Sequence, residues 1–141
     1  MTNTMRPIID AVIANISAAS VLSACAVGKD YSVMESAASA AAVVSYTGVR
    51  SNPDTFSTRE RLITVRCELF VKDVTSPSVM MDYVSDISDM VVSSLEDDLT
   101  LQGTVEEVRE VRATRTPGDV FSNGTVLYLP VNIEVDAVYS L

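Results

Sequence analysis

The sequence has no histidine and only two cysteines among its 141 residues. Without histidine, the chain cannot build a Ser-His-Asp triad, a histidine general base or the usual zinc sites. Two cysteines do not make a disulfide framework, and Cys67 falls on the apolar side of a predicted strand, where we expect a small core residue. Basic residues are also few, ten against nineteen acidic ones, for a formal net charge of −9. This balance argues against binding of free nucleic acid through phosphate contacts.

Motifs that mark catalysis or phosphate binding are missing as well. The sequence contains no Gly-x-Ser-x-Gly elbow and no phosphate-binding glycine loop, and its serines have no histidine to activate them. Asp82, Asp86 and Asp89 share one face of a predicted helix, where a solvated surface explains them better than a divalent-cation site. We therefore expect no enzyme, no metal and no cofactor. No run of about 18 apolar residues is present, so we expect no membrane-spanning helix.

Residues 61–95 hold the clearest pattern in the chain. From Arg61 to Lys72 the sequence RLITVRCELFVK alternates apolar and polar positions, which predicts a strand with one buried face. After a turn at residues 75–77, apolar side chains recur with a period of 3.6, which predicts an amphipathic helix. The apolar stripe of this helix consists of Met80, Tyr83, Val84, Ile87, Met90, Val91 and Leu95. A half-buried strand followed by a half-buried helix implies a sheet with helices on at least one face.

Weaker patterns fill the rest of the chain. They predict one more helix and three more strands, at residues 4–19, 42–49, 104–115 and 125–139. Residues 20–40 are dominated by small side chains, and we expect a loop there. The third of these segments has valines at every third position from Val105 to Val111, so neither period is clean. Its β-branched content and the flanking Gly103 and Pro117-Gly118 favour a strand, with or without a bulge, over a helix. Pro130 cannot donate to a ladder, which places that part of the last strand near an edge or a bend.

Two polar loops, residues 50–60 and 115–124, each contain one isolated aromatic side chain, Phe56 and Phe121. Each phenylalanine either anchors a partner protein or packs back on its own domain. A third polar feature is the run of three carboxylates at residues 96–98, where the predicted helix ends. Negative charge is unfavourable at a helix C-terminus, so these carboxylates are either simply solvated or face a basic partner.

The predicted strands are long for a chain of this size. A 141-residue globule has a diameter of roughly 37 Å, whereas the strands over residues 61–72 and 125–139 would span about 40 Å and about 50 Å. We expect these strands either to bend, for instance at Pro130, or to project beyond the core as a hairpin. Projecting strands with bare edges are a liability for a monomer and useful in a ring or stack. The strand length therefore favours an oligomer.

The order of these elements, from Met5 to Tyr139, resembles that of the tail terminator proteins of tailed bacteriophages. The resemblance is carried by the alternating strand RLITVRCELFVKD, the helix MMDYVSDISDMVVSSLEDD and the LQGTV that follows it. It implies a mixed α/β fold that assembles as a six-fold ring at the head-proximal end of the tail. Such a ring stops polymerisation of the tail tube and gives the neck proteins of the head a docking surface. The family has no catalytic residues to carry over.

The resemblance also implies the partners of the chain. They are five other copies in a homohexamer, the tail tube protein, a head-completion or neck protein, and the sheath where the tail is contractile. Genomic DNA passes through the lumen only as cargo, and the acidity of the chain fits a channel in which like charge prevents sticking. The protein would then reside in the virion after assembly in the host cytoplasm, with no membrane partner. We expect the two polar loops to carry the axial contacts, through Asp54, Phe56, Arg59, Arg115, Asp119 and Phe121.

Three other functions stay open on the sequence. Another neck component, such as a head-completion, tail-completion or connector protein, has similar size and composition and is the closest alternative. A tail tube subunit would have more β-structure and less helix. An enzyme or a small-molecule binding domain would need a polar constellation that the sequence does not offer.

These patterns predict one domain over residues 1–141 with an α/β (α+β) fold. Its sheet is mixed, mostly antiparallel and of about four strands. Two main helices pack on one face of that sheet, and the long strands project as a hairpin.

Overall fold

The computed structural model describes residues 5–18, 25–31, 40–52, 60–72, 77–116, 120–123 and 126–140. They form two helices, α1 (Met5–Ala18) and α2 (Pro77–Glu96). Six strands form one sheet: β1 (Cys25–Gly28), β2 (Ala40–Asn52), β3 (Glu60–Lys72), β4 (Glu107–Thr114), β5 (Phe121–Asn123) and β6 (Val126–Ser140). The order is β1-β2-β3-β6-β4, with β5 also paired to β6. Only β1 and β2 are parallel, which confirms the expected mixed, mostly antiparallel α+β fold.

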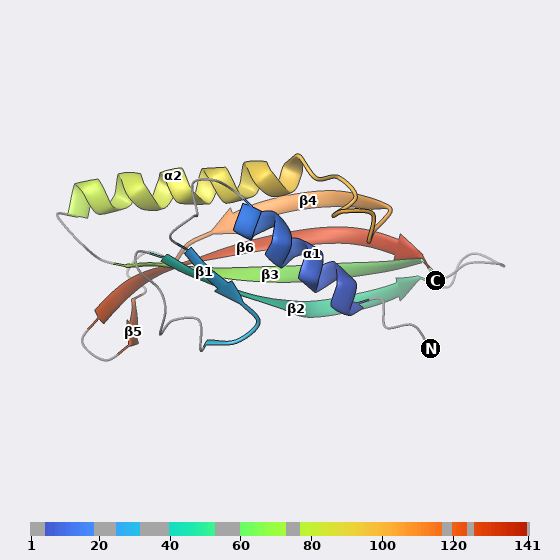
Figure 1. The fold of residues 1–141 in the computed structure, drawn as a ribbon, viewed down its shortest axis with the longest axis horizontal. Helices are drawn as coiled ribbons and strands as arrows, with labels where there is room; N and C mark the ends of the chain where they lie inside the picture. Colours follow the sequence, from blue (N-terminus) through green and yellow to red (C-terminus); the bar gives the residue numbers. More distant parts are fainter. Residues whose placement is uncertain are drawn as a thin grey trace.

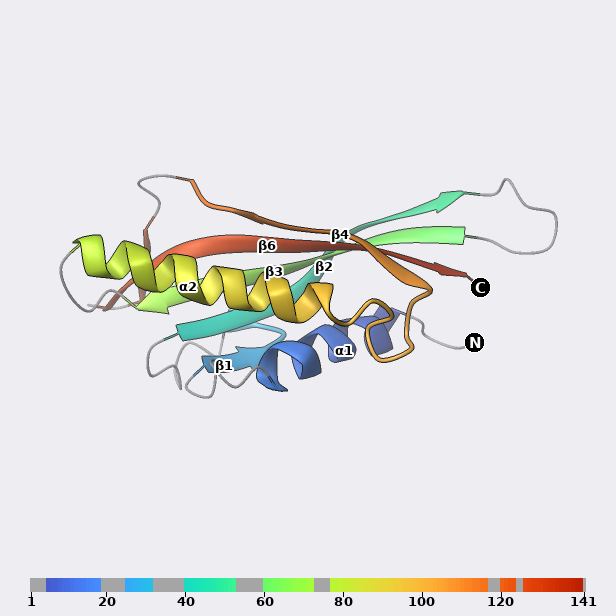
Figure 2. The ribbon, with the colours of Figure 1, turned by 90° about the horizontal axis from the view of Figure 1, so that it is seen from above.

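Both helices lie against the same face of the sheet, as expected (Figures 1 and 2). We call this the helix face, and the opposite side the open face. Neither described helix is both long enough and apolar enough to cross a membrane.

Strand β3 is central because β2 pairs along one of its edges and β6 along the other. Its odd-numbered side chains, including Ile63, Val65 and Cys67, are buried on the helix face, while even-numbered ones such as Arg66 point to the open face. The alternation predicted for this strand is therefore confirmed, and Cys67 is a core residue only 1% exposed. Each large apolar side chain buried here contributes about 1.5–3 kcal/mol relative to exposure.

The helices supply the second layer of the core. Helix α2 buries four apolar residues of its predicted stripe, Val84, Ile87, Val91 and Leu95. Helix α1 also buries four apolar residues along one side, Ile8, Ala11, Val12 and Ile16. The two helices are also joined by polar contacts. The Asn15 amide donates to the Ser94 carbonyl oxygen at 3.0 Å, and the Ser94 hydroxyl donates to Asn15 Oδ1 at 2.8 Å.

The segment after α2 is a tight turn and not the start of a strand. Leu101, Gln102 and Gly103 have φ values of 44°, 58° and 80°, all in the left-handed region. The backbone amide of Gln102 donates to Asp98 Oδ1 at 3.1 Å, and the Leu101 side chain is fully buried in the core. The strand predicted from residue 104 therefore begins three residues later, because the chain must first reverse direction.

Strand β4 is a strand, as its β-branched content indicated, and it contains a bulge. Its register with β6 shifts between Val108 and Glu110, so Arg109 is an extra residue. The shift puts Val108 and Val111, three positions apart, on the helix face, where both pack against the core. A similar shift lies in β2 between Tyr46 and Gly48.

The sheet contains the four expected long strands and, in addition, the short strands β1 and β5, which lie in segments predicted as loops. Strand β1 has four residues of small or β-branched type and β5 has three, both too short to show a period of two. Each is defined by its partner, β2 or β6, and not by its own sequence pattern.

The long strands project beyond the helices, as Figure 2 shows. There the end of β2 and the start of β3 extend past both helices, and the end of β6 lies beside them. Pro130 pairs with Phe70 of β3, but on its other side the pairing with β4 ends at Asn132 and that with β5 begins at Tyr128. The proline thus lies at a local edge of the sheet, as predicted.

Candidate partner interfaces

The described residues hold no group of three or more His, Cys, Asp or Glu side chains that could bind a metal ion. Their polar side chains gather instead on the open face and at the two ends of the sheet. The candidate sites are therefore sought on these surfaces.

An ion-pair network occupies the middle of the open face. Arg112 of β4 reaches across to β6, with Nη1 2.7 Å from Asp136 Oδ2 and Nη2 3.0 Å from Glu134 Oε2. The Thr64 hydroxyl of β3 donates to Asp136 Oδ1 at 2.6 Å. Burial alone would raise the pKa of Asp136. The hydrogen bonds from Arg112 and Thr64 and the charges of Arg112 and Arg50 outweigh this effect, so the net result is a lowered pKa. The network links three strands, and its polar groups satisfy one another.

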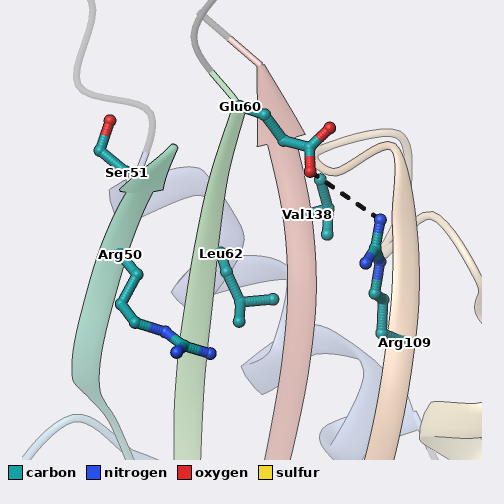
Figure 3. A pocket seen from close by; sticks show the side chains of 6 residues that line it. All are labelled: Arg50, Ser51, Glu60, Leu62, Arg109 and Val138. Atoms are coloured by element: carbon teal, nitrogen blue, oxygen red, sulfur yellow. Dashed lines mark ion pairs between the residues drawn. The ribbon is translucent and has the colours of Figure 1, made fainter. Parts of the chain in front are cut away.

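The projecting end of the open face carries a hollow of about 380 Å³, drawn in Figure 3 and here called the end hollow. Leu62 and Val138 lie between two arginines in Figure 3, Arg50 on β2 and Arg109 on β4. Arg109 Nη2 is 3.9 Å from a carboxylate oxygen of Glu60, the dashed line in Figure 3. Arg50 makes no ion pair with any described residue, so its charge is available to a partner.

The opposite end of the open face is covered by Tyr31. Its ring centroid lies 6.0 Å from that of Phe70, which is only 2% exposed. The Tyr31 hydroxyl donates to the Glu68 carboxylate, at 2.9 Å from Oε1. This hydrogen bond, followed by burial, raises the pKa of Tyr31.

A smaller hollow of about 180 Å³, here called the α2–β4 hollow, lies between α2 and the end of β4. It is lined by Val84, Ser85 and Ser88 of α2, by Ala113, Thr114 and Arg115, and by Val131. Arg115 is half-buried at this site and makes no ion pair with a described residue.

The six residues predicted to contact partners do not form one cluster. Asp54, Phe56, Arg59 and Asp119 lie outside the described residues. Arg115 follows β4, and Phe121 opens β5 opposite Tyr128, with its side chain not described. The strand ends on either side of residues 53–59 lie at one end of the sheet and Arg115 and β5 at the other (Figure 2). The described strand ends that border the two predicted loops therefore lie at two separate ends of the sheet.

Sequence reasoning missed the end hollow as a unit. Arg50 and Glu60 stood at the borders of a predicted polar loop, which was a usable signal. Arg109 gave none, because the bulge in β4 decides on which side its side chain emerges. The sequence matches no protein-family model, and no curated protein is similar enough to count as a relative.

Proposed function

We propose that the chain is a structural subunit of a tailed bacteriophage that forms a ring at the head-proximal end of the tail. In this role it terminates polymerisation of the tail tube and joins the tail to the neck of the head. The proposal starts from the resemblance of residues 5–139 to tail terminator proteins. The observation that carries it furthest is the projection of β2, β3 and β6 beyond the helices (Figure 2).

Projecting strands with open edges favour self-assembly. Strand β4 pairs only with β6, and β1 covers only residues 40–43 of β2, so both sides of the sheet present unpaired backbone groups. Such edges pair readily with other chains unless they are protected. Two different edges on one subunit suit a head-to-tail contact, and a head-to-tail contact that closes makes a ring.

The separation of the two candidate loop surfaces also supports the proposal. A ring between tube and head needs two different axial faces, one for each neighbour. Residues 53–59 and 115–123 are bordered by strand ends at opposite ends of the long sheet (Figure 2). One loop can therefore face the tail tube while the other faces the neck protein.

The test is the mass of the purified protein by light scattering, alone and after mixing with its tail tube. We expect a six-subunit species, or a monomer that becomes a six-subunit cap on tube ends in electron micrographs. A twelve-subunit ring would indicate a neck connector instead. A monomer that ignores tubes would rule out both roles.

A further inference from the structure

The α2–β4 hollow contains polar groups that lack partners. The Ser88 hydroxyl oxygen is buried and has no hydrogen-bond partner. Ser85, Thr114 and Arg115 line the same hollow, and none makes a side-chain hydrogen bond to another described residue. A buried hydroxyl without a partner is costly, and a polar group that enters the hollow would supply the missing hydrogen bond.

The chemistry of the lining selects a carboxylate. Among the described residues of the lining, Arg115 alone is charged, and the guanidinium group matches the geometry of a carboxylate through paired hydrogen bonds. The volume of about 180 Å³ corresponds to roughly six water molecules. That space fits the end of an acidic side chain but not a nucleotide.

The edge of the sheet offers the route by which such a side chain enters. Strand β4 pairs only with β6, and Ala113 and Thr114 beside the hollow are exposed. An extended segment that adds to this edge points every second side chain towards the helix face. One of these side chains would enter the hollow between β4 and α2.

We propose that the α2–β4 hollow docks an extended segment of a partner protein and binds one Asp or Glu of that segment through Arg115 and Ser88. The inference rests on the proposed function, because it names the chemistry of one axial partner. Strands β1 (Cys25–Gly28) and β2 (Ala40–Asn52) of a second copy cannot supply the acidic side chain, since neither contains an acidic residue.

A titration followed by amide NMR tests the proposal without tail or head proteins. The probes are two capped heptapeptides of alternating threonine and valine, one with a central aspartate and one with a central asparagine. The aspartate peptide is expected to bind at least about tenfold more tightly, with shifts at Ser88 and slowed exchange of the β4 amides. In Arg115→Gln the preference for aspartate should disappear.

Arg109→Gln is the matched control, because Arg109 lies on the same strand but pairs with Glu107 and Glu60 at the end hollow. This variant should keep the preference. Equal binding of both peptides, no binding, or a preference that persists in Arg115→Gln would each overturn the proposal. The titration measures the preference for aspartate over asparagine and the assembly test measures the subunit mass, so a failure of one can be told from a failure of the other.

Discussion

Arg112 stabilises the carboxylates of the open face, the side of the sheet that no helix covers. Its guanidinium contacts Asp136, Glu134 and Glu110, at 2.7, 3.0 and 3.4 Å. The Asp136 side chain is only 17% exposed, and a carboxylate so enclosed is stable as an anion only with such donors.

The lowered pKa of Asp136 predicts how stability depends on pH. A carboxylate with a lowered folded pKa stabilises the fold above its unfolded pKa of about 3.9, and that stabilisation is lost as pH falls through the folded pKa. Asp136→Asn should therefore cost about 1 kcal/mol at pH 7 by urea unfolding. The difference from wild type should shrink below pH 4. Glu107→Gln, in an exposed pair with Arg109, serves as control, and a pH-independent cost for Asp136→Asn would contradict the assignment.

The Ser88 hydroxyl, proposed to bind a partner, should lower the stability of the free protein, and this can be tested. Its buried, unpartnered hydroxyl is unfavourable in the free protein, so Ser88→Ala should raise the free energy of unfolding by about 1 kcal/mol. The control Ser85→Ala removes an exposed hydroxyl of the same helix, and should gain only about 0.5 kcal/mol from helix propensity. If Ser88→Ala destabilises the protein in thermal unfolding, the hydroxyl has a partner in solution.

At this scale the sequence predicted apolar positions better than polar ones. The burial of Cys67 followed from the alternation of its own strand. The pairing of Arg112 with Asp136 did not, because the two residues are 24 positions apart and meet only through the register of β4 and β6. The role of Asp98 could not be predicted from the sequence either. Its carboxylate accepts hydrogen bonds from the Gln102 backbone amide and from the Asn15 side chain, whereas the sequence predicted either simple solvation or a basic partner.

The turn after α2 depends on one glycine. Gly103 has a φ of 80°, and a Cβ added there would meet no atom within 4 Å. Gly103→Ala should therefore cost about 1 kcal/mol through backbone strain alone. Gly48→Ala in the β2 bulge also meets open space, but without a positive φ, and should change stability by less than about 0.5 kcal/mol. Equal effects in chemical unfolding would contradict this account of the turn.

Elements with a clear period were predicted, and elements held by tertiary contacts were not. Both helices and the four long strands matched within a few residues, because their apolar stripes recur over three turns or more, or over six residues or more. Strands β1 and β5 are too short for a stripe. The start of β4 was misplaced because Val105 is buried in the turn and not in a strand.

On the scale of the whole molecule, the two ends of the sheet should act independently. Phe56→Asp and Phe121→Asp, in loops at opposite ends, should each weaken binding to one partner, the tail tube or the neck protein, and leave the other intact. Capping of tubes in electron micrographs and co-sedimentation with the neck protein measure the two contacts separately. Loss of soluble protein in either variant would show that the phenylalanine packs on its own domain.

The candidate residues could be chosen from the sequence, but their division between two ends could not. Both loops have the same polar composition with one aromatic, and nothing local tells which end of a strand they occupy. That information lies in the topology, since the paired ends of β2 and β3 and the strand ends around β5 lie at opposite ends of the sheet (Figure 2).

The place of β6 in the sheet has a consequence for biosynthesis. It is the last of the described strands, yet it pairs with β3, β4 and β5. Glu60 of β3, for example, pairs with Ser140, which lies 80 positions later in the chain. Loop closure over such separations slows folding. Until β6 leaves the ribosome, the nascent chain has a central strand with one edge bare. We therefore expect the sheet to close only after β6 has left the ribosome, so that only chains carrying β6 complete the fold.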